Sequence, residues 1–212
     1  MHDTSKGDLI FTHGAGGTLS APAVVNFVRG YAESSPVLAF QGSMNLAARV
    51  KGFLALISNN DGKKGSMLRF GGRSMGARAA VMAASQIIEG GFEEKVELVL
   101  VSYPLKGPKG DLRDEILLSL PKGVAARFII GDKDNMCPLN ELAGVRLKMK
   151  AQTSLLVVKG ADHGMHVRPA PAEEALGEMT GSWAAERKGT GSDEQIWWDG
   201  DAEEVKRGPF KS

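Results

Sequence analysis

The stretch RFGGRSMGARAA, residues 69–80, places one serine between glycines where two kinds of sequence meet. An apolar run precedes it and an alanine-rich run without proline follows it, which predicts a strand and then a helix. Gly72, Ser74 and Gly76 fit the pattern G-x-S-x-G, the sharp turn that raises a nucleophilic serine above a sheet edge. The competing interpretation is that the glycines end a strand and Ser74 caps the helix. The nucleophile interpretation requires other segments of the chain to supply an acid, a base and an oxyanion site, whereas the capping interpretation does not.

Strand-like and helix-like segments alternate along most of the 212 residues. Short apolar runs predict strands within residues 8–17, 36–40, 66–72, 95–103, 124–132 and 153–160. Apolar residues at helical spacing predict helices over residues 20–34, 46–57, 75–90, 111–120, 138–150 and 171–189. This alternation predicts an α/β fold, with a mostly parallel sheet flanked by helices on both faces. We expect one domain over residues 1–189 and a polar C-terminal tail over residues 190–212.

Composition and charge argue against several classes of function. Lys plus Arg number 26 and Asp plus Glu number 25, so the net charge of +1 gives no bulk attraction to nucleic acid or anionic membranes. No apolar run reaches transmembrane length, and the first residues have no signal-peptide pattern. The sole cysteine, Cys137, excludes an internal disulfide and fits a reducing compartment, the cytoplasm or the nucleus. Because Pro138 follows it and no base is placed beside it, we interpret Cys137 as structural.

A nucleophilic serine needs a histidine base, and the chain has four histidines. His2 lies near the terminus and His13 lies in the first glycine-rich loop, whereas His163 and His166 follow the last predicted strand. A side chain in that position can reach over the carboxyl edge of the sheet, where Ser74 is expected. His163 is the favoured base because it lies closer to the end of the strand, and His166 is the alternative.

The acid that orients the histidine is expected on the loop FIIGDKDNMCP, residues 128–138. This loop contains Asp132 and Asp134, and either one gives the chain order serine, aspartate, histidine. Asp134 lies further beyond the strand, where a carboxylate can reach an imidazole. Asp132 is better placed to structure the turn. Asp134 is therefore the favoured acid.

Two backbone N–H groups are expected to face the negative charge that develops during acyl transfer. One belongs to Met75, which follows the serine at the start of a helix. The other is expected in the loop HGAGG, residues 13–17, where Ala15 is favoured and Gly16 is the alternative.

The residues that would contact a substrate are less clearly marked. Gly16, Tyr103, Leu105 and Met136 are the candidates for substrate binding. Ordinary packing at strand ends explains the last three equally well. Only PLKGPKGD, residues 104–111, separates a predicted strand from its helix, so we expect an open site without a lid domain.

The loop THGAGGTL, residues 12–19, also raises the question of a nucleotide site, because it follows a strand and precedes a helix. A dinucleotide-binding loop would need a glycine in place of Leu19 and an acid about 20 residues later, which AFQGSMN lacks. GKKGS has the wrong spacing for a triphosphate-binding loop, and no His, Cys or Asp cluster has metal-ligand spacing. We therefore expect no metal and no cofactor.

Together, the segments FTHGAGG, GGRSMGAR, SYPLKGP, GDKD and DHGM resemble the α/β-hydrolase superfamily over about residues 8–185. They resemble most the branch that holds testis-expressed protein 30 and the hydrolase-like domain of the KAT8 regulatory NSL complex subunit 3, near the dienelactone hydrolases. The resemblance implies that Ser74, Asp134 and His163 form the catalytic triad of a serine hydrolase acting on a small ester or related acyl bond. The sequence starts almost directly on the strand before the HG loop, so the hairpin usual in relatives is expected to be missing or truncated.

The resemblance also leaves a second class of function open. Members of this branch include scaffolding subunits, so the alternative is a catalytically idle interaction module on the same fold. The enzyme would act on a small-molecule acyl substrate, whereas the module would bind a protein partner. Neither interpretation defines an oligomeric state.

Overall fold

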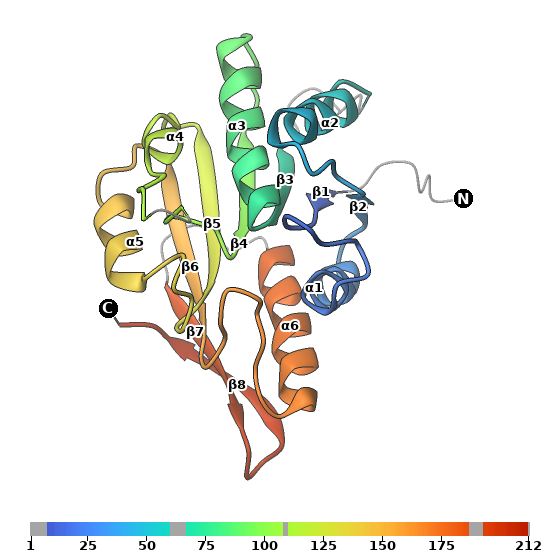
Figure 1. The fold of residues 1–212 in the computed structure, drawn as a ribbon, viewed down its shortest axis with the longest axis vertical. Coiled ribbons are helices and arrows are strands. Elements are labelled where there is room, and N and C mark those ends of the chain that lie inside the picture. The colour runs from blue at the N-terminus through green and yellow to red at the C-terminus, as the bar shows by residue number, and fades with distance from the viewer. Residues whose placement is uncertain (1–7, 60–66, 108–109, 187–192, 212) are drawn as a thin grey trace.

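The computed structural model describes residues 8–59, 67–107, 110–186 and 193–211, in which strands and helices alternate along the chain (Figure 1). The strands are β1 Leu9–Thr12, β2 Val37–Phe40, β3 Leu68–Arg73, β4 Val96–Val101, β5 Val124–Gly131, β6 Gln152–Val158, β7 Glu194–Asp199 and β8 Glu204–Pro209. The helices are α1 Pro22–Ala32, α2 Leu46–Asn59, α3 Met75–Glu89, α4 Glu115–Leu118, α5 Leu139–Arg146 and α6 Ala170–Ala185.

The described strands form one 8-stranded sheet in the order β2-β1-β3-β4-β5-β6-β7-β8. All neighbouring pairs are parallel except β7 and β8, which are antiparallel. The chain runs from β1 outward to β2 and then returns to place β3 on the other side of β1. In open parallel sheets, such a reversal opens a crevice at the carboxyl ends of the strands. The loops after β1 and β3, which contain the candidate oxyanion donors and Ser74, meet at that crevice.

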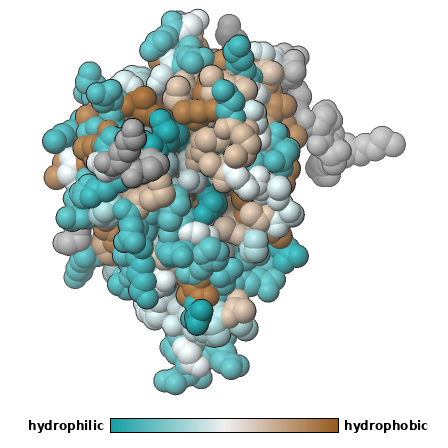
Figure 2. All heavy atoms as spheres, in the orientation of Figure 1, coloured by the Kyte–Doolittle hydropathy of each residue, from teal (hydrophilic) through white to brown (hydrophobic). Residues whose placement is uncertain are grey.

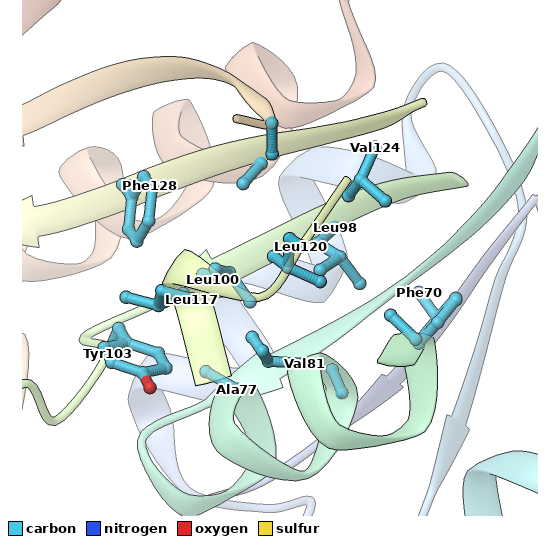
Figure 3. Packing of buried hydrophobic residues seen from close by; sticks show 14 of the residues in the cluster. Phe70, Ala77, Val81, Leu98, Leu100, Tyr103, Leu117, Leu120, Val124 and Phe128 are labelled. Carbon is cyan, nitrogen blue, oxygen red and sulfur yellow. The ribbon is translucent and has the colours of Figure 1, made fainter. Parts of the chain in front are cut away.

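Helices cover both faces of the sheet, which confirms the predicted α/β architecture of a mostly parallel sheet flanked by helices. Buried residues of α2, α3, α4 and α5 pack on one face, and those of α1 and α6 pack on the other. Alternate residues of β4 divide between the two cores: Leu98 and Leu100 face the first, and Val99 and Val101 face the second. Figure 3 shows the first core, in which sheet residues lie opposite Val81 of α3.

The C-terminal segment corrects one expectation. Residues 194–199 and 204–209, predicted to lie in a polar tail, form β7 and β8 and extend the sheet. Ile196 is fully buried in the core beneath α1 and α6. The apolar residues here are too few to indicate a strand, and backbone pairing with β6 decides the structure. The turn of the hairpin is hydrophilic, visible as teal and near-white spheres at the lower end of Figure 2.

A second correction concerns the predicted helix over residues 111–120, which shortens to the single turn of α4. The preceding residues pair with an earlier part of the same connection: Lys106 bridges Leu112, and the Arg113 N–H donates to the Leu105 carbonyl. Backbone groups engaged in this pairing are unavailable to a helix. The described residues of the connection therefore form a folded loop, and they include no lid domain.

The described residues also contain no helix with the length and apolar character needed to cross a membrane. They contain no group of three or more His, Cys, Asp or Glu side chains arranged to hold a metal ion.

Candidate active site

Ser74 lies at a sharp turn between β3 and α3, with φ of 52° and ψ of −115°. A residue other than glycine adopts a positive φ at an energetic cost, and such strain is concentrated at functional sites. A Cβ on Gly72 would lie 2.7 Å from the Thr12 carbonyl oxygen, and one on Gly76 would lie 2.7 Å from that of His13. Only glycine therefore fits on either side of the serine. The Ser74 hydroxyl makes no capping hydrogen bond to α3, which argues against the capping interpretation.

Ser74, His163 and Asp134 form a continuous chain of hydrogen bonds. Oγ of Ser74 lies 2.9 Å from Nε2 of His163, and Nδ1 of His163 lies 2.9 Å from Oδ2 of the buried Asp134. A carboxylate only accepts hydrogen bonds, so Nδ1–H donates to Asp134 and Nε2 accepts from the Ser74 hydroxyl. Oδ1 of Asp134 also accepts from the N–H groups of Met136 at 2.8 Å and Cys137 at 3.2 Å. These bonds hold the carboxylate toward the imidazole.

The alternative acid and base lie outside this chain. Asp132 accepts a hydrogen bond from the Gly160 N–H at 2.6 Å, so its carboxylate connects the loop after β5 with the loop after β6. His166 is exposed and its Nδ1 lies 3.1 Å from Oδ2 of Asp162. Burial acts to raise the pKa of Asp162, but the hydrogen bonds and charge of His166, together with the N–H of Gly164, lower it overall.

The loop after β1 passes beside the serine. A Cβ on Gly14 would lie 3.4 Å from the serine Cβ. The Gly16 N–H donates to Sδ of Met44 at 3.2 Å and is therefore engaged. In contrast, the N–H groups of Ala15 and Met75 donate to none of the residues that the structure describes. Ala15 and Met75 thus leave two backbone donors free on the loops that flank Ser74.

A buried arginine of α2 holds this loop in place. The Arg49 guanidinium donates to the carbonyl oxygens of His13, Gly14, Ser43 and Gly42, from two neighbouring loops. His13 is itself buried: its Nδ1 donates to the Gly14 carbonyl at 2.7 Å, and its Nε2 accepts from the Gly42 N–H at 3.0 Å. Burial lowers the pKa of His13, which favours the neutral ring that this pair of bonds requires.

A family model described as an alpha/beta hydrolase domain matches residues 5–185 of the 212. The chain belongs to the α/β hydrolase family. The match spans every element from β1 to α6, including the three loops that bring Ser74, Asp134 and His163 together.

Solved structures resemble this α/β hydrolase in fold. Est1E from Butyrivibrio proteoclasticus, solved with ferulic acid bound, has a TM-score of 0.60 and 14% identity over 83% of this chain and 87% of its own. An alpha-beta serine hydrolase homologue from Coxiella burnetii has a TM-score of 0.56 and 16% identity over 82% and 83%. A putative hydrolase of the alpha/beta superfamily from Xanthomonas campestris pv. campestris has a TM-score of 0.55 and 15% identity over 84% and 98%.

Arg73 connects the two loops that flank the serine of this hydrolase. Its Nη2 donates to the main-chain carbonyl of His163 at 2.6 Å. Its Nη1 lies 2.8 Å from the position that a Cβ on Gly14 would take. The guanidinium therefore lies between the histidine loop and the loop after β1. Burial lowers the pKa of Arg73, and the nearby Asp134 and Asp162 oppose that effect.

Two of the four candidate substrate-binding residues do not lie where a substrate could reach them. Tyr103 and Leu105 have no exposed surface and belong to the core under α3 and α4, so neither can contact a substrate here. The interpretation as strand-end packing is the correct one for both. Met136 is half-buried beside Asp134, and Gly16 is exposed on the loop after β1. Cys137 is buried, and burial raises the pKa of its thiol, consistent with a structural role.

Sequence reasoning missed Arg49 and Arg73. Arg49 precedes Val50 and lies four residues before Phe53, both buried, so it falls on the apolar side of a predicted helix. An arginine on an apolar stripe is the signal that could have indicated a buried cation. Arg73 stands inside the G-x-S-x-G segment, but no spacing in the sequence indicates that it reaches the His163 loop.

Proposed function

We propose that this α/β hydrolase is a serine hydrolase that cleaves a small ester or a related acyl bond through an acyl-enzyme intermediate. The observation that carries the proposal is the unbroken series of hydrogen bonds from Ser74 through His163 to the buried Asp134. A nucleophile, a base and an orienting carboxylate joined in that way are the parts that covalent acyl transfer requires.

In the first half-reaction, Oγ of Ser74 attacks the carbonyl carbon of the substrate while Nε2 of His163 takes the hydroxyl proton. The N–H groups of Ala15 and Met75 stabilise the tetrahedral oxyanion. His163 then returns the proton to the leaving alcohol, which departs and leaves the acyl group on Ser74. Asp134 keeps the proton on Nδ1 and stabilises the imidazolium that forms transiently.

In the second half-reaction, water attacks the acyl-enzyme and His163 takes the proton of that water. The same oxyanion donors serve again, and His163 protonates Ser74 as the acid departs. Loss of one oxyanion donor typically costs about 2.7–4 kcal/mol of transition-state stabilisation. The free N–H of Ala15 and the engaged N–H of Gly16 support Ala15 as the loop donor.

The motif pair THGAGG and GGRSMG supports placing the chain in the branch of testis-expressed protein 30. Within that branch, the folded loop between β4 and α4 supports an open site that admits small or flexible acyl groups.

Labelling with a fluorophosphonate probe tests the proposal directly, because the probe phosphonylates an activated serine. We expect the wild-type protein to be labelled and Ser74→Ala to be unlabelled, with the circular dichroism spectrum unchanged. Ser20→Ala removes an exposed serine and should be labelled like the wild type. Hydrolysis of p-nitrophenyl acetate should be lost in the same variant that loses labelling.

Two results would count against the proposal. Labelling that survives in Ser74→Ala would place the reactive group elsewhere. A folded wild-type protein that is neither labelled nor active would favour the interaction module, and a search for protein partners would follow.

A further inference from the structure

Arg78 lies one helical turn after the proposed nucleophile. Its N–H donates to the Ser74 carbonyl at 3.2 Å, so the two residues stack on the first turn of α3. Side chains on a helix lean toward its N-terminus. The Arg78 side chain therefore leans toward the end of α3 where Ser74 stands.

The Arg78 side chain is half-buried, and among the described residues it has no hydrogen-bonding partner. Its Nε is fully buried without a hydrogen bond, and no carboxylate among the described residues lies within ion-pair distance. Burial is the main cause that lowers the pKa of Arg78, and the nearby Arg113 lowers it further. Burying part of a cation without a partner costs free energy, and perturbed charged groups of this kind are found more often at binding sites.

The charged side chains that influence Arg78 are one arginine and one aspartate, so the positive charge of Arg78 itself is left over. Arg113 and Asp111 lie close enough to influence it, and Nε of Arg113 lies 3.3 Å from Oδ2 of the exposed Asp111. The Tyr103 hydroxyl donates to the Arg113 carbonyl at 2.9 Å and fixes this part of the loop. Figure 3 shows Tyr103 near Ala77, the residue before Arg78. Asp111 thus pairs with Arg113, and no described carboxylate pairs with Arg78.

Other buried or half-buried arginines have partners among the described residues, as Arg73 does in the His163 carbonyl. Arg49 donates to four carbonyl oxygens, and Arg69 pairs with Glu97 at 2.7 Å and with Asp8 at 3.3 Å. Arg127 donates to main-chain carbonyls and stacks on Trp183. These guanidinium groups have hydrogen-bond or ion-pair partners within the fold, although Nε of Arg73 and Nε of Arg127 make no hydrogen bond. The Arg78 side chain has no such partner among the described residues, and it lies one helical turn after the proposed nucleophile.

We propose that Arg78, with Arg113 beside it, binds a carboxylate carried on the acyl chain of the substrate. The inference rests on the proposed function, because it concerns the specificity of the same site. A guanidinium binds a carboxylate through two parallel N–H···O bonds, and one carboxylate balances the single unpaired charge. The substrate class is accordingly a half-ester of a dicarboxylic acid.

Paired substrates test this inference. The p-nitrophenyl half-esters of succinate, glutarate and adipate vary the distance from the scissile carbonyl to the carboxylate, and the methyl ester of each removes the charge. For the wild type we expect at least one half-ester to exceed its methyl ester in kcat/KM by about 10- to 100-fold, the contribution of a charge-assisted hydrogen bond. Arg78→Met should lose that ratio, and Arg78→Lys should keep part of it.

Two further variants make the result interpretable. Arg78→Gln is a second neutral replacement that carries the test should Arg78→Met fail to fold. Arg29→Met removes an exposed arginine of α1, paired with Glu174 on the surface, and should keep the wild-type ratio. An equal rate for charged and uncharged esters in the wild type, or an unchanged ratio in the neutral variants, would overturn the inference while leaving the proposed function standing. Absence of fluorophosphonate labelling in the folded wild type would instead overturn the proposed function.

Discussion

At the scale of single residues, the proposed site combines one strained serine with two histidines in opposite environments. His163 has an exposed fraction of 24% and bridges Ser74 and Asp134. His13 is fully buried one loop away, and among the described residues its ring bonds to backbone groups of Gly14 and Gly42. The first is placed to exchange a proton, whereas the second holds the shape of the loop.

The buried His13 predicts a pH dependence of stability. Because its pKa is lowered in the folded protein, the unfolded chain binds a proton at His13 more readily once the pH falls below about 6.5. The free energy of unfolding should therefore decrease on acidification, by at most about 1.4 kcal/mol per pH unit from this group. Urea unfolding between about pH 7.5 and about pH 5.5 measures the effect, and His13→Asn should show a weaker dependence.

Equal pH dependence in the wild type and His13→Asn would contradict this account of His13. Both proteins retain His163 and His166, so their contributions cancel in the comparison.

The residues of the sharp turn around Ser74 were predictable because the G-x-S-x-G spacing encodes a local conformation. Gly72 and Gly76 are required by close backbone approach, and Ser74 takes the strained position between them. The environment of Tyr103 and Leu105 was not predictable in the same way. A residue at a strand end faces either a crevice or the core, and the packing of α3 and α4 places these two in the core.

At the scale of elements, the site depends on two loops that a helix side chain joins. Arg49 of α2 donates to carbonyls of the loop after β1 and of the loop after β2. These strands are neighbours in the sheet, so their loops emerge side by side. The position of the Ala15 N–H is thereby set by a residue outside its own loop.

We expect Arg49→Met to lower kcat for ester hydrolysis by about 100-fold, because a displaced loop misplaces one oxyanion donor. It should also reduce the free energy of unfolding by about 2–4 kcal/mol, since buried carbonyls lose their donors. Steady-state kinetics and urea unfolding measure the two effects. Lys51→Met, at an exposed position of the same helix, should change neither. A destabilised Arg49→Met enzyme with an unchanged kcat would limit Arg49 to a structural role.

At the scale of the whole molecule, the sheet extends two strands beyond α6. β7 pairs with β6 and contributes Ile196 to the core beneath α1 and α6. β8 then pairs with β7 along its full length. Arg207 of β8 pairs with both Glu186 and Glu194, which ties the hairpin to the end of α6. The C-terminal strands are therefore part of the same fold as the residues that precede them.

Ile196→Ala should reduce the free energy of unfolding by about 3 kcal/mol, the usual cost of a cavity at a fully buried isoleucine. Gln195→Ala, on the adjacent and partly exposed position, should cost less than about 1 kcal/mol. Thermal or urea unfolding of the two variants provides the comparison. Equal and small effects would show that β7 contributes little to the core.

The sequence by itself determined the alternation of strands and helices, the sharp turn at Ser74, and the candidate acid and base. Each of these was recognised from residues close together in the chain. Tertiary structure decided what depends on distant partners. The C-terminal segment has few apolar residues, and it forms strands because β7 pairs with β6. Arg49 can be buried because carbonyl oxygens from two loops accept its hydrogen bonds. The same holds for Arg78: that it has no partner among the described residues can be seen only once its neighbours from α3 and the loop after β4 are in place.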